Sequence, residues 1–98
     1  MTIALARTNV IRPADQLGPV LTGRSVAEHL RRQIEAALEV EDAVIVDLDG
    51  VEAISPSFAD ELFAKLPGDA LQSGRVRFEH LDDDTAALVR FVVAGRSG

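Results

Sequence analysis

The chain has 98 residues, enough for one domain, and its 47% hydrophobic content is typical of a folded protein rather than a disordered one. It contains no cysteine, which excludes disulfides, thiolate zinc sites and cysteine nucleophiles. The formal net charge is −6 and the basic residues are scattered, so no basic stripe is available for nucleic acid or for an anionic membrane surface.

Two short apolar runs near the N-terminus predict strands, at Thr2–Ala6 and at Val20–Thr22. The segment RPADQLGP between them is rich in turn residues, so the two strands could pair as a hairpin. The opening residues MTIALARTNV have too short an apolar run and the wrong flanks for a signal peptide. No stretch reaches the roughly twenty apolar residues of a membrane span, and we therefore expect a cytoplasmic protein.

A long amphipathic helix is predicted from Ser25 onward. Ser25 and Glu28 have the S-x-x-E spacing of a capping box, in which two side chains satisfy free backbone amides at a helix start. Glu28 and Arg32 have the favourable i,i+4 spacing of an ion pair. Apolar residues recur every three or four positions on one face, and charged residues occupy the other: Val26, Leu30, Ile34, Ala37 and Leu38 against Glu28, Arg31, Arg32, Glu35 and Glu39.

The second half of the chain alternates strands and helices. Ala43–Leu48 is a short run rich in β-branched residues, typical of a central strand buried on both faces, and Val76–Leu81 predicts a further strand. The last helix should begin at the Asp82–Asp84 run and end near Gly95. The order β-β-α-β-α-β-α predicts a single α/β domain with a small mixed, largely parallel sheet flanked by about three helices.

The stretch VDLDGVEAISPSFADELF, residues 46–63, carries the residues of greatest functional interest. Asp49 and Gly50 form a turn signal, while Asp47 lies in a strand and therefore needs hydrogen-bond partners. Ser55 and Pro56 favour a helix start, as N-cap and first helical residue. Helical periodicity then predicts one buried face and one solvated face, with Phe58, Ala59, Leu62, Phe63 and Leu66 inside and Ser57, Asp60, Glu61 and Lys65 outside.

Ser57 has two open interpretations. It is either an ordinary first-turn serine or a phosphoacceptor or ligand contact, because free amides and the helix dipole favour an anion at this position. Glu61 and Lys65 stand at i,i+4 spacing, which favours a solvated ion pair over a catalytic role for Glu61.

On the stretch VIVDLDGVEAISPSFADELF, and more weakly on LTGRSVAEHLRRQIEAAL before it, the chain resembles the STAS-like domain family of unknown function found in bacterial and archaeal proteins. This family is related to the STAS anti-sigma factor antagonists. The resemblance extends over residues 18–94 of the 98. It implies a STAS-type α/β fold and a regulatory, protein-binding role without catalysis.

In the antagonists a serine at the start of this helix is phosphorylated by an ATP-binding partner kinase. The resemblance places that phosphoacceptor on Pro56, which cannot be phosphorylated, and the neighbouring motif positions on Ser55, Ser57 and Phe58. It therefore supports this helix start as a docking position, whereas a phospho-switch would need Ser57 or Ser55 in the acceptor role.

The leading hypothesis is a non-catalytic module that binds a partner protein, for example a kinase-type ATPase, through Asp49, Ser57, Asp60 and Glu61. The alternatives are a phospho-switch modified on Ser57 and a domain that binds a small anionic ligand. We expect no cofactor and no bound metal, because the Asp82–Asp84 run lacks the ligand spacing of a calcium loop.

Enzymatic chemistry is not expected. VIVDLDG superficially resembles the phosphoacceptor strand of a receiver domain, but the acidic pair and the lysine of that family have no counterpart here. His29 and His80 lie on different elements, and each is interpreted as a surface residue. The last helix, TAALVRFVVAG, is apolar around most of its circumference, which indicates deep burial or a contact with another chain such as a homodimer.

Overall fold

The computed structural model describes residues 7–97, with side chains described up to residue 90. Its elements, in chain order, are β1 (Thr8–Ile11), α1 (Pro13–Leu17), β2 (Val20–Leu21), α2 (Arg24–Val40), β3 (Ala43–Asp47), β4 (Ala53–Ile54), α3 (Pro56–Ala59), η1 (Asp60–Ala64), α4 (Gly68–Gln72), β5 (Val76–Glu79) and α5 (Asp83–Ser97). The predicted α/β class is confirmed, and the three long helical segments are those expected from the sequence.

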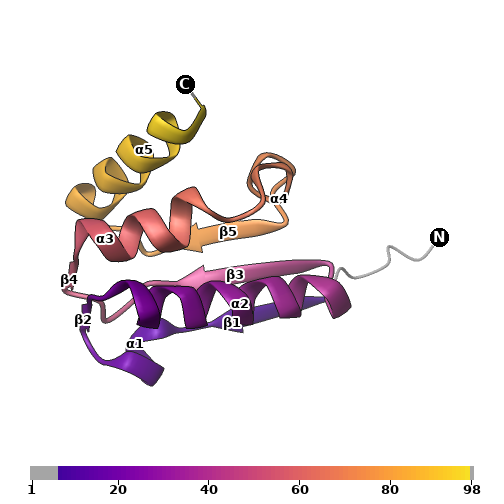
Figure 1. Cartoon of the computed structure of the whole chain (residues 1–98). Coiled ribbons are helices and arrows are strands. Elements are labelled where there is room, and N and C mark those ends of the chain that lie inside the picture. Colours follow the sequence, from indigo (N-terminus) through magenta and orange to yellow (C-terminus); the bar gives the residue numbers. More distant parts are fainter. Residues whose placement is uncertain (1–6, 98) are drawn as a thin grey trace.

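The strands form two small sheets (Figure 1). The larger has the order β1-β3-β5 with both pairings parallel, and the smaller joins β2 to β4, also in parallel. The predicted strand Thr2–Ala6 lies outside the described residues. The predicted strand near Val20 is present, but within the described chain it pairs with Ala53–Ile54.

The hydrophobic core of the described residues lies between the larger sheet and the helices. Val44 and Val46 of β3 are fully buried and pack in one cluster with the inner face of α2, which contributes Ala27, Leu30, Ile34 and Ala37. Phe63 adds an edge-to-face contact with Phe78 of β5, with ring centroids 4.7 Å apart. The prediction that β3 is buried on both faces was wrong. Its residues alternate between buried and half-buried, because the helices of this core cover one face of the sheet.

The start of α2 also differs from its prediction. The helix begins at Arg24 with Gly23 as N-cap, two residues before the predicted N-cap Ser25, and no side chain caps it. Ser25 therefore lies inside the first turn, where the capping-box hydrogen bonds are not made. The predicted ion pair of Glu28 with Arg32 is confirmed at 2.7 Å.

The segment predicted as a turn after β1 contains a short helix, α1, which begins at Pro13. Ala14 of α1 packs against the Asp49–Gly50 turn, where Gly50 has φ 87° and an added Cβ would lie 3.2 Å from the Ala14 methyl group. Glycine is thus favoured there by backbone conformation and by close approach.

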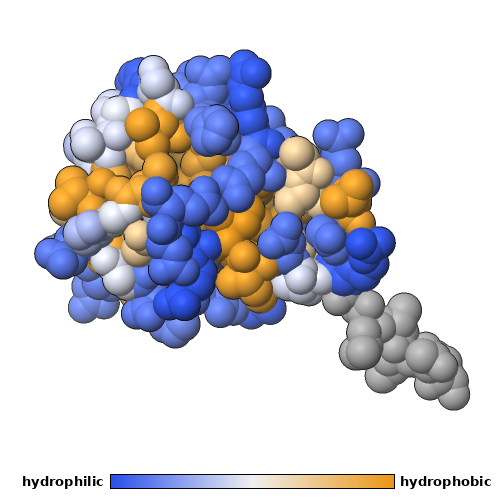
Figure 2. Space-filling model, turned by 90° about the horizontal axis from the view of Figure 1, so that it is seen from below, coloured by the Kyte–Doolittle hydropathy of each residue, from blue (hydrophilic) through white to orange (hydrophobic). Residues whose placement is uncertain are grey.

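Several large hydrophobic side chains remain exposed on β1, α1 and β2, among them Val10, Leu17 and Val20. Figure 2, which views the molecule from below, shows hydrophobic areas interspersed with a mostly hydrophilic surface. Separate apolar residues of this kind are ordinary on a protein surface.

The helices α3 and η1 form one continuous helical segment, from Pro56 to Ala64, whose second half has the wider π-helical turn. It contacts α2 on one side and α5 on another. Leu88 and Val89 of α5 are half-buried against the core. This contact accounts for part of the apolar surface of α5; the side chains of this helix after residue 90 lie outside the described set, so the predicted contact with another chain stays a prediction.

Candidate functional site

The carboxyl ends of the three parallel strands meet at one edge of the sheet, at the left of Figure 1. The first residues of α2, α3 and α5 lie on this same side of the molecule. In open α/β sheets ligands bind preferentially outside the carboxyl ends of the strands. The segment predicted to be functional, residues 46–63, runs through this edge.

The start of α3 has the predicted capping chemistry. Ser55 is the N-cap, and its Oγ accepts a hydrogen bond from the Phe58 N–H at 3.2 Å. Pro56 occupies the first helical position. The Ser57 Oγ lies 3.3 Å from the Ser55 Oγ, and its side chain is half-buried. Ser55 therefore has a structural role, while Ser57 is partly open to solvent.

Asp60 extends this surface toward α2. Its carboxylate accepts a hydrogen bond from the Arg24 guanidinium at 3.2 Å, and both side chains remain partly exposed. The position of Arg24 at the first turn of α2 brings a cation close to the start of α3. The sequence reasoning had missed this residue.

Glu61 does not lie where it was predicted. Its side chain is 8% exposed, whereas the helical periodicity placed it on the solvated face. The reason is the surroundings of η1, which α2 and α5 flank on two sides, together with the wider π turn that changes which residues face inward. Glu61 is thus an internal residue, and the assumption that it is exposed for docking was wrong.

The Glu61 carboxylate lies at the centre of a charged network. It accepts hydrogen bonds from Lys65 at 2.9 Å and from Arg31 at 3.4 Å, and Arg24 lies 3.6 Å away. The hydrogen bond from Lys65, with further contributions from Arg31, lowers the pKa of Glu61 against the opposing effect of burial. Arg31 is 17% exposed and also pairs with Glu35 of the predicted charged face at 3.0 Å, so this part of the charged face of α2 turns toward η1.

Asp49 belongs to a second charged cluster, at the ends of β1, β3 and β5. Arg12, which follows β1, contacts Asp49 at 3.0 Å and Asp47 at 3.5 Å. His80, which follows β5, places its Nδ1 2.6 Å from the Asp47 Oδ1. The four residues predicted to bind a partner are therefore divided between this cluster and the α3–η1 segment.

Asp47 has the hydrogen-bond partners that its strand position requires. Its carboxylate accepts the Asp49 N–H at 2.9 Å, and this bond, together with the contact to His80, lowers the pKa of Asp47. The same contact raises the pKa of His80. His80 is exposed, as predicted, but has φ 60°, a conformation uncommon outside glycine.

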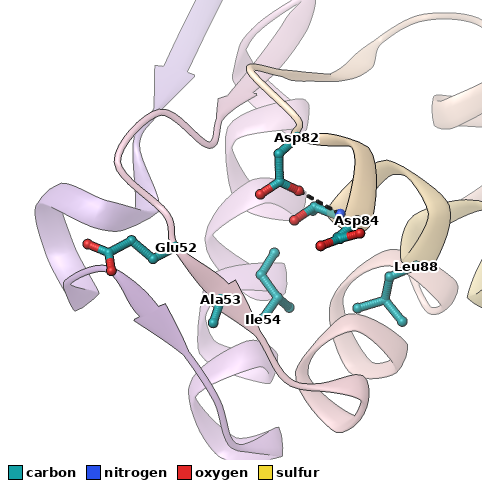
Figure 3. Close-up of a pocket in the computed structure, with 7 residues that line it drawn as sticks. Glu52, Ala53, Ile54, Asp82, Asp84 and Leu88 are labelled. Atoms are coloured by element: carbon teal, nitrogen blue, oxygen red, sulfur yellow. Dashed lines mark hydrogen bonds between the residues drawn. The ribbon is translucent and has the colours of Figure 1, made fainter.

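A pocket of about 240 Å³ lies beside the start of α3, between β4 and the first turns of α5 (Figure 3). It is lined by Glu52, Ala53, Ile54, Asp82, Asp84, Thr85 and Leu88. Asp82 caps α5 by accepting the Thr85 N–H at 2.7 Å, and this bond lowers the pKa of its carboxyl group. No local sequence pattern predicts this pocket, because its walls come from segments about thirty residues apart.

Residues 26–86 match the family model described as a STAS-like domain of unknown function (DUF4325). The chain belongs to this family. No curated protein and no solved structure matches the chain. The matched part of the STAS-like domain contains most of α2, β3, the α3–η1 segment and the start of α5, and it includes all four predicted site residues.

The described part of the STAS-like domain contains neither a cluster of metal-binding side chains nor a membrane-spanning helix. Residues 7–97 contain no group of three or more histidine, cysteine or acidic side chains arranged to hold a metal ion. Among the same residues, no helix combines the length and the hydrophobicity that a bilayer crossing requires.

Proposed function

We propose that this STAS-like domain is a non-catalytic regulatory module that docks a partner protein at the start of α3. The observation that carries the proposal is the unequal exposure of the α3–η1 segment. Most of its side chains are buried, whereas Pro56, Ser57 and Asp60 reach the surface beside Arg24. We call these four residues the α3 surface.

The α3 surface offers a partner several kinds of contact in a small area. It presents a rigid proline, a hydroxyl group and an ion pair whose two members remain partly exposed. The helix beneath is held by the Ser55 cap and by the Glu61 network, so the surface is already ordered before a partner arrives. Such preorganisation reduces the entropy lost on binding.

The other two residues predicted to bind a partner, Glu61 and Asp49, have different roles in this proposal. Glu61 supports the α3 surface from inside, through Arg24 and Arg31, and does not itself contact the partner. Asp49 lies in the cluster with Arg12 and joins the interface only if the partner also covers the ends of the strands. An ATP-binding, kinase-type regulator is the class of partner we favour, on the basis of the family relationship.

A charge-reversal experiment tests the docking surface. The tagged chain is captured gently from its native cells, each co-eluting protein is purified, and its affinity is measured for wild type, Asp60→Lys and Glu39→Lys. Glu39 is an exposed acidic residue near the far end of α2, so Glu39→Lys carries the same charge change away from the α3 surface. We expect Asp60→Lys to weaken binding by about ten-fold or more and Glu39→Lys to leave it unchanged. Equal affinity of all three proteins would overturn the proposal.

The phospho-switch is the second candidate, and the half-buried Ser57 hydroxyl is the observation in its favour. A phosphate there would meet the free amides of the first turn but would also lie one helical turn from Asp60, so it would change the charge of the α3 surface. Intact-mass measurement of the captured chain decides between the candidates. A phosphate-sized increment that Ser57→Ala removes supports the switch, and an unmodified chain with a bound partner supports constitutive docking.

A further inference from the structure

The pocket between β4 and α5 has an acidic rim and an apolar floor (Figure 3). Its charged lining residues are Glu52, which precedes β4, and Asp82 and Asp84 at the start of α5. Its apolar lining residues are Ala53, Ile54 and Leu88. Among the described side chains, no basic residue lines it. A site of this composition favours a ligand that joins a positive charge to an aliphatic stem, as arginine and lysine side chains do.

Two of the acidic residues are available to a partner. Among the described side chains, Glu52 and Asp84 form no ion pair and no side-chain hydrogen bond, whereas Asp47, Asp49, Asp60 and Glu61 are all paired with basic residues. Asp82 has a separate task, the capping of α5. The Asp84 carboxylate therefore lies at the pocket without a cation of this chain among the described side chains, whereas the Glu52 side chain points away from Asp82 and Asp84 (Figure 3).

The backbone of β4 adds a second feature. The N–H groups of Ala53 and Ser55 donate to the Pro19 and Leu21 carbonyls on the β2 side, at 3.3 and 2.9 Å. Because alternate residues of a parallel strand bond to opposite sides, the N–H and C=O of Ile54 point to the other edge of β4. That edge borders the pocket and α5 (Figure 3).

We propose that an extended, basic segment of the partner lies along the free edge of β4 and places an arginine or lysine side chain in this pocket. The segment pairs with the Ile54 backbone, its apolar side chains contact Ile54 and Leu88, and its cation lies beside Asp84. Short-strand addition of this kind combines main-chain hydrogen bonds with side-chain pockets. The inference rests on the proposed docking function, because β4, which lines the pocket, directly precedes α3 in the chain. It specifies the chemistry of the partner that docks there.

A peptide titration of the whole 98-residue chain tests the inference. The probe is acetyl-Ile-Arg-Val-Arg-Val-amide, followed through the backbone amide signals in two-dimensional NMR spectra. The comparison probe has citrulline in place of both arginines and so keeps the shape without the charge. We expect the arginine peptide to shift the amide signals of Ile54, Thr85 and Leu88, and the citrulline peptide to bind about ten-fold more weakly.

Two variants of the acidic run provide the matched control. Asp84→Lys and Asp83→Lys make the same charge change one residue apart in the first turn of α5, but only Asp84 lines the pocket. We expect Asp84→Lys to abolish the shifts and Asp83→Lys to preserve most of them; the spectra themselves report whether each variant is folded. Asp84→Asn, a milder change, should weaken binding by several-fold.

Equal binding of the two peptides, or equal effects of the two lysine variants, would overturn the inference. So would displacement of the peptide by Ca²⁺ at a concentration below that of the peptide, which would indicate a cation site. Its failure is distinguishable from that of the docking function. If the captured partner loses affinity for Asp60→Lys but not for Asp84→Lys, docking stands and the pocket inference is wrong. If the peptide binds and the partner has the same affinity for Asp60→Lys as for wild type, the assignment of the α3 surface is wrong and the pocket site stands.

Discussion

Asp60 and Glu61 are adjacent acidic residues of one helical segment, yet they have opposite roles. The Asp60 side chain is 39% exposed and contacts Arg24, whereas the Glu61 side chain is 8% exposed and lies among Arg24, Arg31 and Lys65. One residue is available to a partner, and the other holds α2 and η1 together. The difference arises from what surrounds each position, since the two carboxylates are chemically alike.

The same contrast occurs twice more in residues 46–63. Asp47 is 15% exposed and bonded to His80, while Asp49 is 63% exposed. Ser55 caps α3, while the hydroxyl of Ser57 contacts, among the described residues, only that of Ser55. Each pair thus combines a residue that stabilises the strand-to-helix junction with a neighbour that has fewer side-chain contacts within the described part of the domain. Residues one or two positions apart in this segment therefore differ in how much of the fold depends on them.

The strongest test of the contrast is Glu61→Lys against Asp60→Lys. A lysine at position 61 would place a further positive charge beside Arg31 and Lys65, so we expect the melting temperature to fall by about 10 °C or more, or the domain not to fold. Asp60→Lys should lower it by no more than about 3 °C, because its ion pair is exposed. Thermal unfolding followed by circular dichroism measures both. Equal effects would show that Glu61 is not internal.

A more moderate effect separates the two serines. Ser55→Ala removes an N-cap, which costs about 1 kcal/mol, whereas Ser57→Ala should change stability by less than about 0.5 kcal/mol. Chemical denaturation of both variants in urea measures the difference. Ser55→Asp is the matched rescue, because aspartate is also a good N-cap. If Ser57→Ala proves the more damaging, the capping role has been assigned to the wrong serine.

Part of this arrangement follows from local sequence. Ser55 and Pro56 carry their own capping chemistry, and the start of α3 is where it was predicted. The β-branched run of β3 and the aliphatic face of α2 are likewise local patterns, and both are present. The start of α2 was predicted wrongly. Ser25 and Glu28 have the spacing of a capping box, but the N-cap of the helix is Gly23.

The remainder depends on tertiary contacts that no local pattern contains. Glu61 is internal because α5 and α2 both pack beside η1, and an ideal helical projection takes no account of either neighbour. The cluster of Arg12, Asp47 and His80 unites residues that follow three different strands. The acidic pocket likewise forms only when α5 folds back beside β4.

The smallest expected effect concerns Asp47 and His80, and it depends on pH. Because the folded state raises the pKa of His80, this residue contributes stability below its ordinary pKa of about 6.5 and loses that contribution as the pH rises through the raised value. Because the pKa of Asp47 is lowered, its contribution is present above about pH 3.9 and is lost as the pH falls through the lowered value. The stability difference between wild type and His80→Gln should therefore be greatest between about pH 4 and 6.5.

Urea denaturation across this pH range measures the stability difference. An NMR titration should show that the pKa of His80 is lower in Asp47→Asn than in wild type. A pKa unaltered by that change would mean that the pair has no energetic role, and the contrast between Asp47 and Asp49 would then be one of exposure alone.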